Sequence, residues 1–259
     1  MPHQPQNKVE IYPTGAVLPD NLLRMYIYFP REMSTHDSLE HIDVLNADGE
    51  PVEGVFLSPK YELWSPDHRR LTLLLDPGRV KTGLAAHDRL GRALIPGRDF
   101  TLIIMDTLVG ADGCALGAQT THAFSVGASD FDPPDPENWD LALPAAGTKE
   151  PLRIDLGSPH DHVSLAHGLR VVDQDGTLVP GALSLENEES VWVFHPGHAW
   201  NNAPYRLTVD SLFEDLAGNR PGALFDRPVV EKPQDWANTI HFRPSETAQK
   251  TDVPIGIDD

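Results

Sequence analysis

Apolar and polar residues alternate in short runs along the whole chain, and this pattern predicts strands. A period of two turns one face of a strand toward a core and the other toward solvent. Such runs occur at 25–29, 71–75, 100–104, 191–194 and 205–209. Turn-forming residues bound them, as at Asp48-Gly49 and Asp175-Gly176. No stretch keeps a helical period, although single helical turns are expected around 38–41 and 164–167. The chain is therefore predicted to be all-β.

The second half of the chain repeats motifs of the first half in the same order and at a nearly constant offset. Six ordered agreements arise by chance far less readily than one, so we interpret them as two copies of one β-sandwich. The matched blocks are 24–30 with 153–159, 38–41 with 164–167, 44–49 with 171–176, 75–78 with 194–197, 100–102 with 205–207, and 111–113 with 216–218.

The repeat sets the expected domain boundaries. The first sandwich spans 8–127 and the second spans 139–230. Between them, residues 128–138 include the acidic, proline-rich run SDFDPPDPEN, which is typical of a stiff, extended and exposed linker. Residues 231–259 form a polar extension, expected to be partly disordered, in which 236–242 could add an edge strand to a sheet or to a partner chain.

The order of turn and core motifs resembles a known family. The first half contains FP-x-x-M, D-G-x-x-V, D-P-G and G-x-x-F-T-L, and the second contains D-G-x-x-V followed by E-D-L-A-G-N at 214–219. These motifs are similar to the bacterial immunoglobulin-like domains of the SbsA type, and 214–219 is the closest match. The resemblance implies two tandem immunoglobulin-like β-sandwich domains in an uncharacterised two-domain bacterial protein. Because the motifs belong to turns and cores, they describe a fold and no chemistry.

The charge narrows the range of partners. Residues 1–127 carry 11 Lys/Arg and 16 Asp/Glu, whereas residues 128–259 carry 9 and 23, for a net charge of −19. Such an acidic surface repels phosphate backbones, so nucleic acid is not an expected partner. No apolar run reaches the length of a membrane span.

The sequence does not decide the cellular compartment of the protein. The first residues, MPHQPQNKVE, lack the apolar core of a signal peptide, which suits a cytoplasmic protein or the mature form of an envelope or secreted one. The single cysteine, Cys114, permits no intramolecular disulfide.

The two copies differ most in a connection of the first one. The segment 79–97 is 14 residues longer than its counterpart and is basic, since it and its edge carry Arg79, Lys81, Arg89, Arg92 and Arg98. Insertions on a rigid sandwich often carry binding, so this loop is a candidate site for a small anionic ligand or a protein partner. The alternative is that its cations pair with the acidic second half and fix the angle between the domains.

A second candidate site lies just before this loop. Glu62 and Asp76 could act as an acid/base pair or bind a cation, and Trp64 together with Arg79 and Lys81 could complete a ligand site. The structural alternative makes Trp64 a core anchor and Asp76-Pro77-Gly78 a turn. The structural interpretation is favoured.

Histidines are frequent and suggest a metal. His160 and His162 have a spacing that brings two ligands to one side of a strand, and His195 and His198 flank a Pro-Gly turn. Zinc or copper is the metal these ligands would hold, although surface histidines that respond to mild acidity are the simpler interpretation. Asp215 and Asn219 could similarly bind calcium, but their spacing favours a turn.

Two functions therefore remain open. The first is a non-catalytic immunoglobulin-like binding or structural module that recognises a ligand or partner through the basic loop and the interdomain cleft. The alternative is a small enzyme or metalloprotein with a site near Glu62, Asp76, Arg79, Lys81 and His162. The sequence contains no G-x-S-x-G motif and no phosphate-binding glycine loop after a strand, which favours the first.

Overall fold

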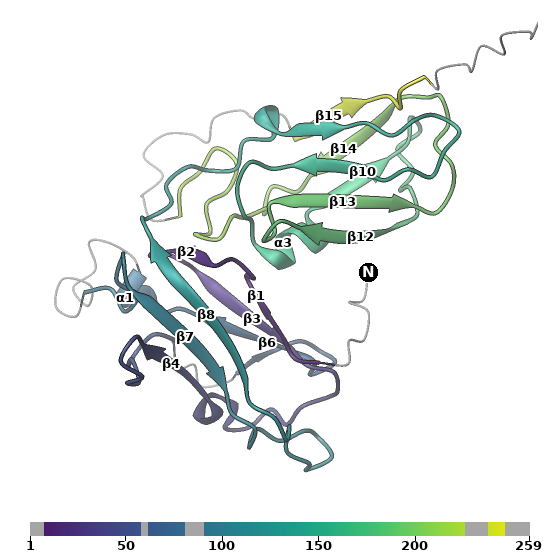
Figure 1. The fold of residues 1–259 in the computed structure, drawn as a ribbon. Helices are drawn as coiled ribbons and strands as arrows, with labels where there is room; N and C mark the ends of the chain where they lie inside the picture. The colour runs from purple at the N-terminus through teal and green to yellow at the C-terminus, as the bar shows by residue number, and fades with distance from the viewer. Residues whose placement is uncertain (1–7, 58–61, 81–90, 226–237, 247–259) are drawn as a thin grey trace, which may run out of the picture.

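The computed structural model describes residues 8–57, 62–80, 91–225 and 238–246. In these residues the chain is nearly all β and forms two immunoglobulin-like sandwiches in tandem, as the sequence predicts (Figure 1). None of the described helices is long and apolar enough to cross a bilayer.

Short strands joined by turns build both sandwiches. In the first half they are β1 (Glu10–Tyr12), β2 (Val17–Pro19), β3 (Arg24–Tyr28), β4 (Ile42–Asn46), β5 (Leu63–Trp64), β6 (Arg70–Leu74), β7 (Asp99–Ile104) and β8 (Thr120–Gly127). In the second half they are β9 (Asp140–Ala142), β10 (Leu152–Asp155), β11 (Leu169–Val172), β12 (Gly181–Glu186), β13 (Val191–Pro196), β14 (Tyr205–Val209) and β15 (Thr239–Phe242).

Within the described residues, the helices are single turns or little more. They are η1 (Ser38–His41), α1 (Pro77–Val80), η2 (Pro136–Asn138) and α3 (His162–His167). The two helical turns expected from the sequence are thus confirmed as η1 and α3.

The two sandwiches share one strand order. The first pairs β1-β3-β6-β5 with β2-β8-β7-β4, and the second pairs β9-β10-β13-β12 with β11-β14-β15. Matching the sheets strand by strand sets β3 against β10, β6 against β13, β4 against β11, β7 against β14 and β8 against β15. Three blocks of the sequence repeat begin on the pairs β3/β10, β4/β11 and β7/β14, and the block 38–41 with 164–167 lies on η1 and α3. The one parallel pairing among the described strands joins β2 to β8.

Each sandwich buries its own apolar core. Met25, Ile27 and Leu102 lie in the first, and Trp192, Leu207 and Phe213 lie in the second. The first core also includes Leu216, which comes from the second half of the chain. A residue of the second copy therefore completes the packing of the first.

The edge strand that the sequence allows within 236–242 is present, and the linker differs from the sequence expectation. Residues 239–242, which the sequence leaves in a C-terminal extension, form β15 and pair with β14 at the edge of the second sandwich. The linker is not simply exposed, because Pro134 and Pro136 are buried. The position of β15 is set by its pairing with β14, which local pattern does not record.

Candidate functional site

The most concentrated group of buried polar side chains lies where the two sandwiches meet. Figure 1 shows α3 and the end of the second sandwich next to β1 and β3 of the first. We call this region the domain junction and define it by the following residues: Tyr12, Thr14, Arg24, Tyr26, Tyr28, Asp161, His162, Glu188, Glu189, Glu214, Leu216 and Arg220.

Arg24 is the centre of the junction. It projects from β3 and its guanidinium bonds to the Glu214 carboxylate, while its Nε lies 3.6 Å from Asp161 Oδ2. Glu214 and Asp161 are 6% and 4% exposed. A cation from the first sandwich is thus held between two buried carboxylates of the second, and removing Arg24 would leave the buried Asp161 carboxylate without an ion-pair partner.

Both carboxylates have further donors. The Tyr26 hydroxyl donates to Asp161 Oδ2 at 2.8 Å, and the Ser164 amide donates to Asp161 Oδ1 at 2.8 Å, which caps the start of α3. Arg220 donates to Glu214 Oε1 from Nε and from a terminal nitrogen, at 2.8 and 2.6 Å. Burial and the neighbouring Asp161 carboxylate raise the pKa of Tyr26, so this phenol stays a donor.

Aromatic rings close one side of the junction. Tyr12 stacks on the imidazole of His162 with ring centroids 3.6 Å apart, and Tyr28 meets the same imidazole edge-on at 5.4 Å. Outward-facing Tyr26 and Tyr28 alternate on β3 with inward-facing Met25 and Ile27. Large side chains on both faces indicate a strand that is covered on both sides.

A strained hairpin docks from the second sandwich. Asn187, Glu188 and Glu189 have φ values of 49°, 54° and 64°, which is unusual for consecutive residues other than glycine. This backbone turns Glu189 toward the first sandwich, where it accepts hydrogen bonds from the amide and the hydroxyl of Thr14, both at 2.8 Å. Burial raises the pKa of Glu189 against these hydrogen bonds.

A third set of contacts fixes the linker. Asn21 exchanges two hydrogen bonds with the backbone of Asp130, at 2.7 and 2.8 Å, and Asn219 donates to the same carbonyl at 3.2 Å. The amide of Leu23 donates to the carbonyl of Leu216 at 2.9 Å. The segment 214–219, which is the closest match to the SbsA-type motifs, therefore bonds to both the linker and the first sandwich. We call this segment the bracket.

Asp215 shapes this bracket from inside. Its Oδ1 accepts the amides of Ala217 and Asn219, at 2.8 and 2.9 Å, and its Oδ2 accepts the Asn219 side chain at 2.9 Å. Both carboxylate oxygens thus face N–H donors, which is the turn role that the sequence favours over calcium binding. Burial raises the pKa of Asp215 to about 7, and the nearby Asp130 adds to the effect.

We expect the Asp215 carboxyl to contribute stability that is lost as pH rises from about 4 to about 7, against the opposite contribution of His160, whose pKa is lowered to about 4 by burial. The Asp215 carboxyl has an ordinary pKa of 3.8 and titrates near 7 in the folded protein. Between these values the folded state holds a proton that the unfolded chain has lost, so raising pH favours unfolding until the stabilisation is gone above pH 7. A shift of this size corresponds to at most about 4 kcal/mol. Urea unfolding at pH values from 4 to 8 measures it.

Two variants isolate the contribution. Asp215→Asn should remove the falling contribution, so between pH 4 and pH 7 its free energy of unfolding should fall less, or rise more, than that of the unmodified protein. Asp173 accepts amides at the same spacing, from Asp175 and Thr177, in hydrogen bonds open to solvent, so Asp173→Asn should leave the slope unchanged. Equal slopes for the unmodified protein and Asp215→Asn would contradict the assignment.

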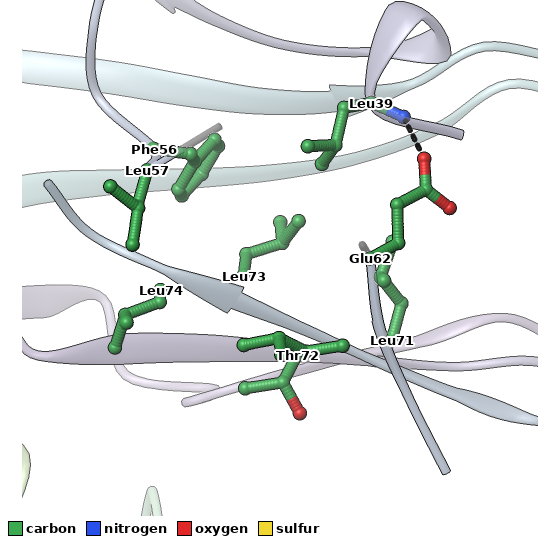
Figure 2. Close-up of a pocket in the computed structure, with 9 residues that line it drawn as sticks. Leu39, Phe56, Leu57, Glu62, Leu71, Thr72, Leu73 and Leu74 are labelled. Carbon is green, nitrogen blue, oxygen red and sulfur yellow. Dashed lines mark hydrogen bonds between the residues drawn. The ribbon is translucent and has the colours of Figure 1, made fainter. Parts of the chain in front are cut away.

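At the predicted site around Glu62, the Glu62 carboxylate accepts hydrogen bonds from neighbouring groups of the first domain. Glu62 accepts the amide of Leu39 at 3.2 Å, at the start of η1 (Figure 2). It also accepts the indole N–H of Trp64 at 2.8 Å. Trp64 packs against Phe29, with ring centroids 5.6 Å apart. The recess beside Glu62 measures about 10 Å³, which is room for about one water molecule.

The described part of the basic loop is similarly bonded to its own domain. Asp76 accepts the amide of Gly78 at 2.8 Å. Arg79 donates to the carbonyl of Gly91 at 2.6 Å, and Arg92 pairs with Asp20 at 2.9 Å. Glu62, Asp76 and Arg79 therefore each bond to a different group of the first domain. Lys81 and Arg89 lie outside the described residues.

The four candidate metal ligands fall in different environments. His160 is buried between Trp139 and Phe213, with its Nδ1 2.7 Å from the Ser158 carbonyl, and burial lowers its pKa to about 4. His162 belongs to the junction, where it stacks on Tyr12. His195 and His198 are exposed, with His195 bonded to the Ser184 hydroxyl at 2.9 Å. Within the described parts of the chain, no three His, Cys, Asp or Glu side chains are grouped to hold a metal ion.

The sequence pointed to the interdomain cleft and to His162, but it did not identify Arg24, Tyr26, Asp161 or Glu214. Tyr26 and Asp161 are 135 positions apart, and Arg24 and Glu214 are 190 apart. The one available signal was the strand Arg24–Tyr28, which carries large side chains on both faces.

Comparisons with known proteins add little. No protein-family model matches the chain, and no curated protein sequence matches it. The resemblance to the SbsA type thus gains no support from a family model and stays a prediction. The TM-scores below are too low to bear on the fold or the function.

Among solved structures, the chain is similar to a fragment of native alpha-2-macroglobulin from Escherichia coli. The TM-score is 0.29 at 12% identity, over 92% of this chain and 72% of the other. A second structure of the native E. coli protein gives a TM-score of 0.29 at 11% identity, over 92% of this chain and 14% of the other. Tandem Ig repeats of Dlar give 0.25 at 11%, over 81% and 94%.

Proposed function

We propose that the chain is a non-catalytic immunoglobulin-like binding module whose two sandwiches act as one rigid unit and present their outer surfaces to a protein partner. The observation that carries this proposal is the position of Arg24 between the buried carboxylates of Asp161 and Glu214. The polar side chains of the junction bond to one another, as expected of an interface that fixes the relative orientation of two domains.

The spread of the contacts supports rigidity. The hairpin at Glu189, the ion pairs of Arg24 and the bracket at Asp130 connect the sandwiches at three separate places. Rotation about any one of them breaks bonds at the other two.

The interdomain cleft is therefore proposed as a joint and not as the ligand pocket. Arg79 and Arg92 of the basic loop bond within the first domain and to the linker, through Asp20 and Ser129. Recognition through the 79–97 loop stays a prediction for Lys81 and Arg89.

Pulsed electron spin resonance tests the rigidity directly. Cys114 is the single cysteine and is exposed in the first domain, and Gln174→Cys adds a second label on the second domain. We expect one narrow distance distribution in the doubly labelled protein. Arg24→Met should broaden it, because Asp161 and Glu214 lose their shared cation.

A matched variant separates the joint from general charge loss. Arg153 stands in the second copy where Arg24 stands in the first, and it pairs with Glu186 at 2.6 Å on an exposed sheet face. Arg153→Met should leave the distribution narrow. A broad distribution in the protein with an intact junction would overturn the proposal.

A further inference from the structure

We propose that the outer face of sheet β2-β8-β7-β4 is a docking surface for a protein segment that inserts one large apolar side chain next to a lysine or arginine. This inference rests on the proposed binding function and names its surface and the chemistry of its partner.

A groove crosses this face. It has a volume of about 630 Å³ and is lined by Ala16, Leu45, Asn46, Ala47, Gly49, Asp99, Phe100, Thr101, Ala123, Phe124 and Ser125. In Figure 1 the strands β4, β7 and β8 lie in front of the other sheet of the first sandwich, and no described element crosses over them. The groove offers room for a side chain of aromatic size, the kind that most often anchors protein interfaces.

The floor of the groove is a row of three neutral side chains. Leu45 pairs with Thr101 and Thr101 pairs with Ala123, so the three lie side by side across β4, β7 and β8. Because side chains alternate along strands, all three point outward, away from the core residues Val44 and Leu102. Leu45 and Thr101 are half-buried, and Ala123 is exposed.

The second sandwich provides an internal comparison. In its matching sheet, Val172 pairs with Arg206 and Arg206 pairs with His241, in the row that corresponds to Leu45, Thr101 and Ala123. There the same face carries a cation and an imidazole, as a solvated face usually does. The neutral row is thus particular to the first copy and does not follow from the fold.

The exposed apolar area extends beyond the row. Val17, on the neighbouring strand β2, pairs with Ser125 and is 60% exposed. The next outward position on β7 is Ile103, two residues after Thr101. It pairs with Thr121, the next outward position on β8, two residues before Ala123. In a chain in which 23% of residues are charged, a sheet face whose central positions are uncharged is typical of an interaction surface.

Charge beside the row specifies the partner. Asp43 and Asp99 occupy the outward positions next to Leu45 and Thr101 on their strands, and Asp99 accepts the Ser125 hydroxyl at 2.6 Å. Acidic groups at the edge of an apolar groove attract a partner with basic residues and align it. The surface therefore fits an apolar side chain flanked by lysine or arginine.

Selection from a displayed library of random 12-residue peptides tests the surface. We expect the enriched peptides to place an aromatic residue or leucine next to a basic residue. Thr101→Arg combined with Ala123→His installs the residues of the second copy, whose sheet already accommodates them, and should weaken binding about tenfold or more by fluorescence anisotropy. Arg206→Thr, on the matching face, should leave the affinity unchanged.

Several outcomes would overturn the docking surface. They are no enrichment, enriched peptides without this composition, and binding that survives the double substitution. A concentration-dependent dimer in analytical ultracentrifugation that the double substitution dissolves would assign the face to a second copy of the chain instead. The substituted residues lie outside the junction, so spin-label distances report separately on the rigid unit if the docking surface fails.

Discussion

Arg24→Met should destabilise the protein by about 3 kcal/mol, the lower end of the range for breaking a buried ion pair. The substitution keeps most of the apolar stem but leaves Asp161 and Glu214 buried without their shared cation. Glu214 keeps Arg220, and the Arg24 side chain is 25% exposed, so the loss stays below the maximum. Urea unfolding at pH 7 measures the loss.

The control is the matching position of the second copy. Arg153→Met removes an ion pair whose side chains are 41% and 43% exposed, and exposed pairs contribute about 0–1 kcal/mol. The two substitutions change the same residue type at equivalent strand positions. Similar losses for both would show that Arg24 acts as a surface charge and not as the centre of the junction.

Leu216→Ala should destabilise the first sandwich by about 2–4 kcal/mol, although Leu216 belongs to the second half of the chain. Leu216 is 7% exposed and is part of the first core, so its truncation removes buried methyl groups and leaves a cavity. Hydrogen exchange gives the location of the effect. We expect faster exchange of amides in β3 and β6, which belong to the first sandwich.

Leu212→Ala is the matched control, because this nearby leucine is 62% exposed. It should change the free energy of unfolding by less than about 0.5 kcal/mol. If Leu216→Ala speeds exchange in the second sandwich alone, the assignment of Leu216 to the first core is wrong.

The strands show how much of the fold local pattern contains. The runs at 25–29, 71–75, 100–104, 191–194 and 205–209 coincide with β3, β6, β7, β13 and β14 to within two residues at each end. Alternation works here because each of these strands has a buried face in one of the two cores. The edge strand β15 was expected only as a possibility, since nothing in 239–242 names β14 as its partner.

Residues singled out for chemistry show the limit of composition. Glu62 and Arg79 have the functional groups of a binding site, yet their hydrogen bonds go to the amide of Leu39 and the carbonyl of Gly91. A carboxylate or guanidinium in the sequence does not reveal whether the fold gives it a local backbone partner. The same uncertainty applied to His160, whose burial against Trp139 and Phe213 became apparent with the packing of the second core.

The sequence by itself determined the all-β class, the principal strands and the presence of two copies, because these follow from alternation and turn residues that are local. Tertiary structure alone decided how the copies meet. The Arg24–Glu214 ion pair joins residues 190 positions apart, and the hydrogen bonds of Glu189 to Thr14 join residues 175 positions apart. Leu216 of the second half likewise inserts into the first core. Such contacts depend on which faces the folded sandwiches bring together. The alternation of residues within a single strand does not encode that choice.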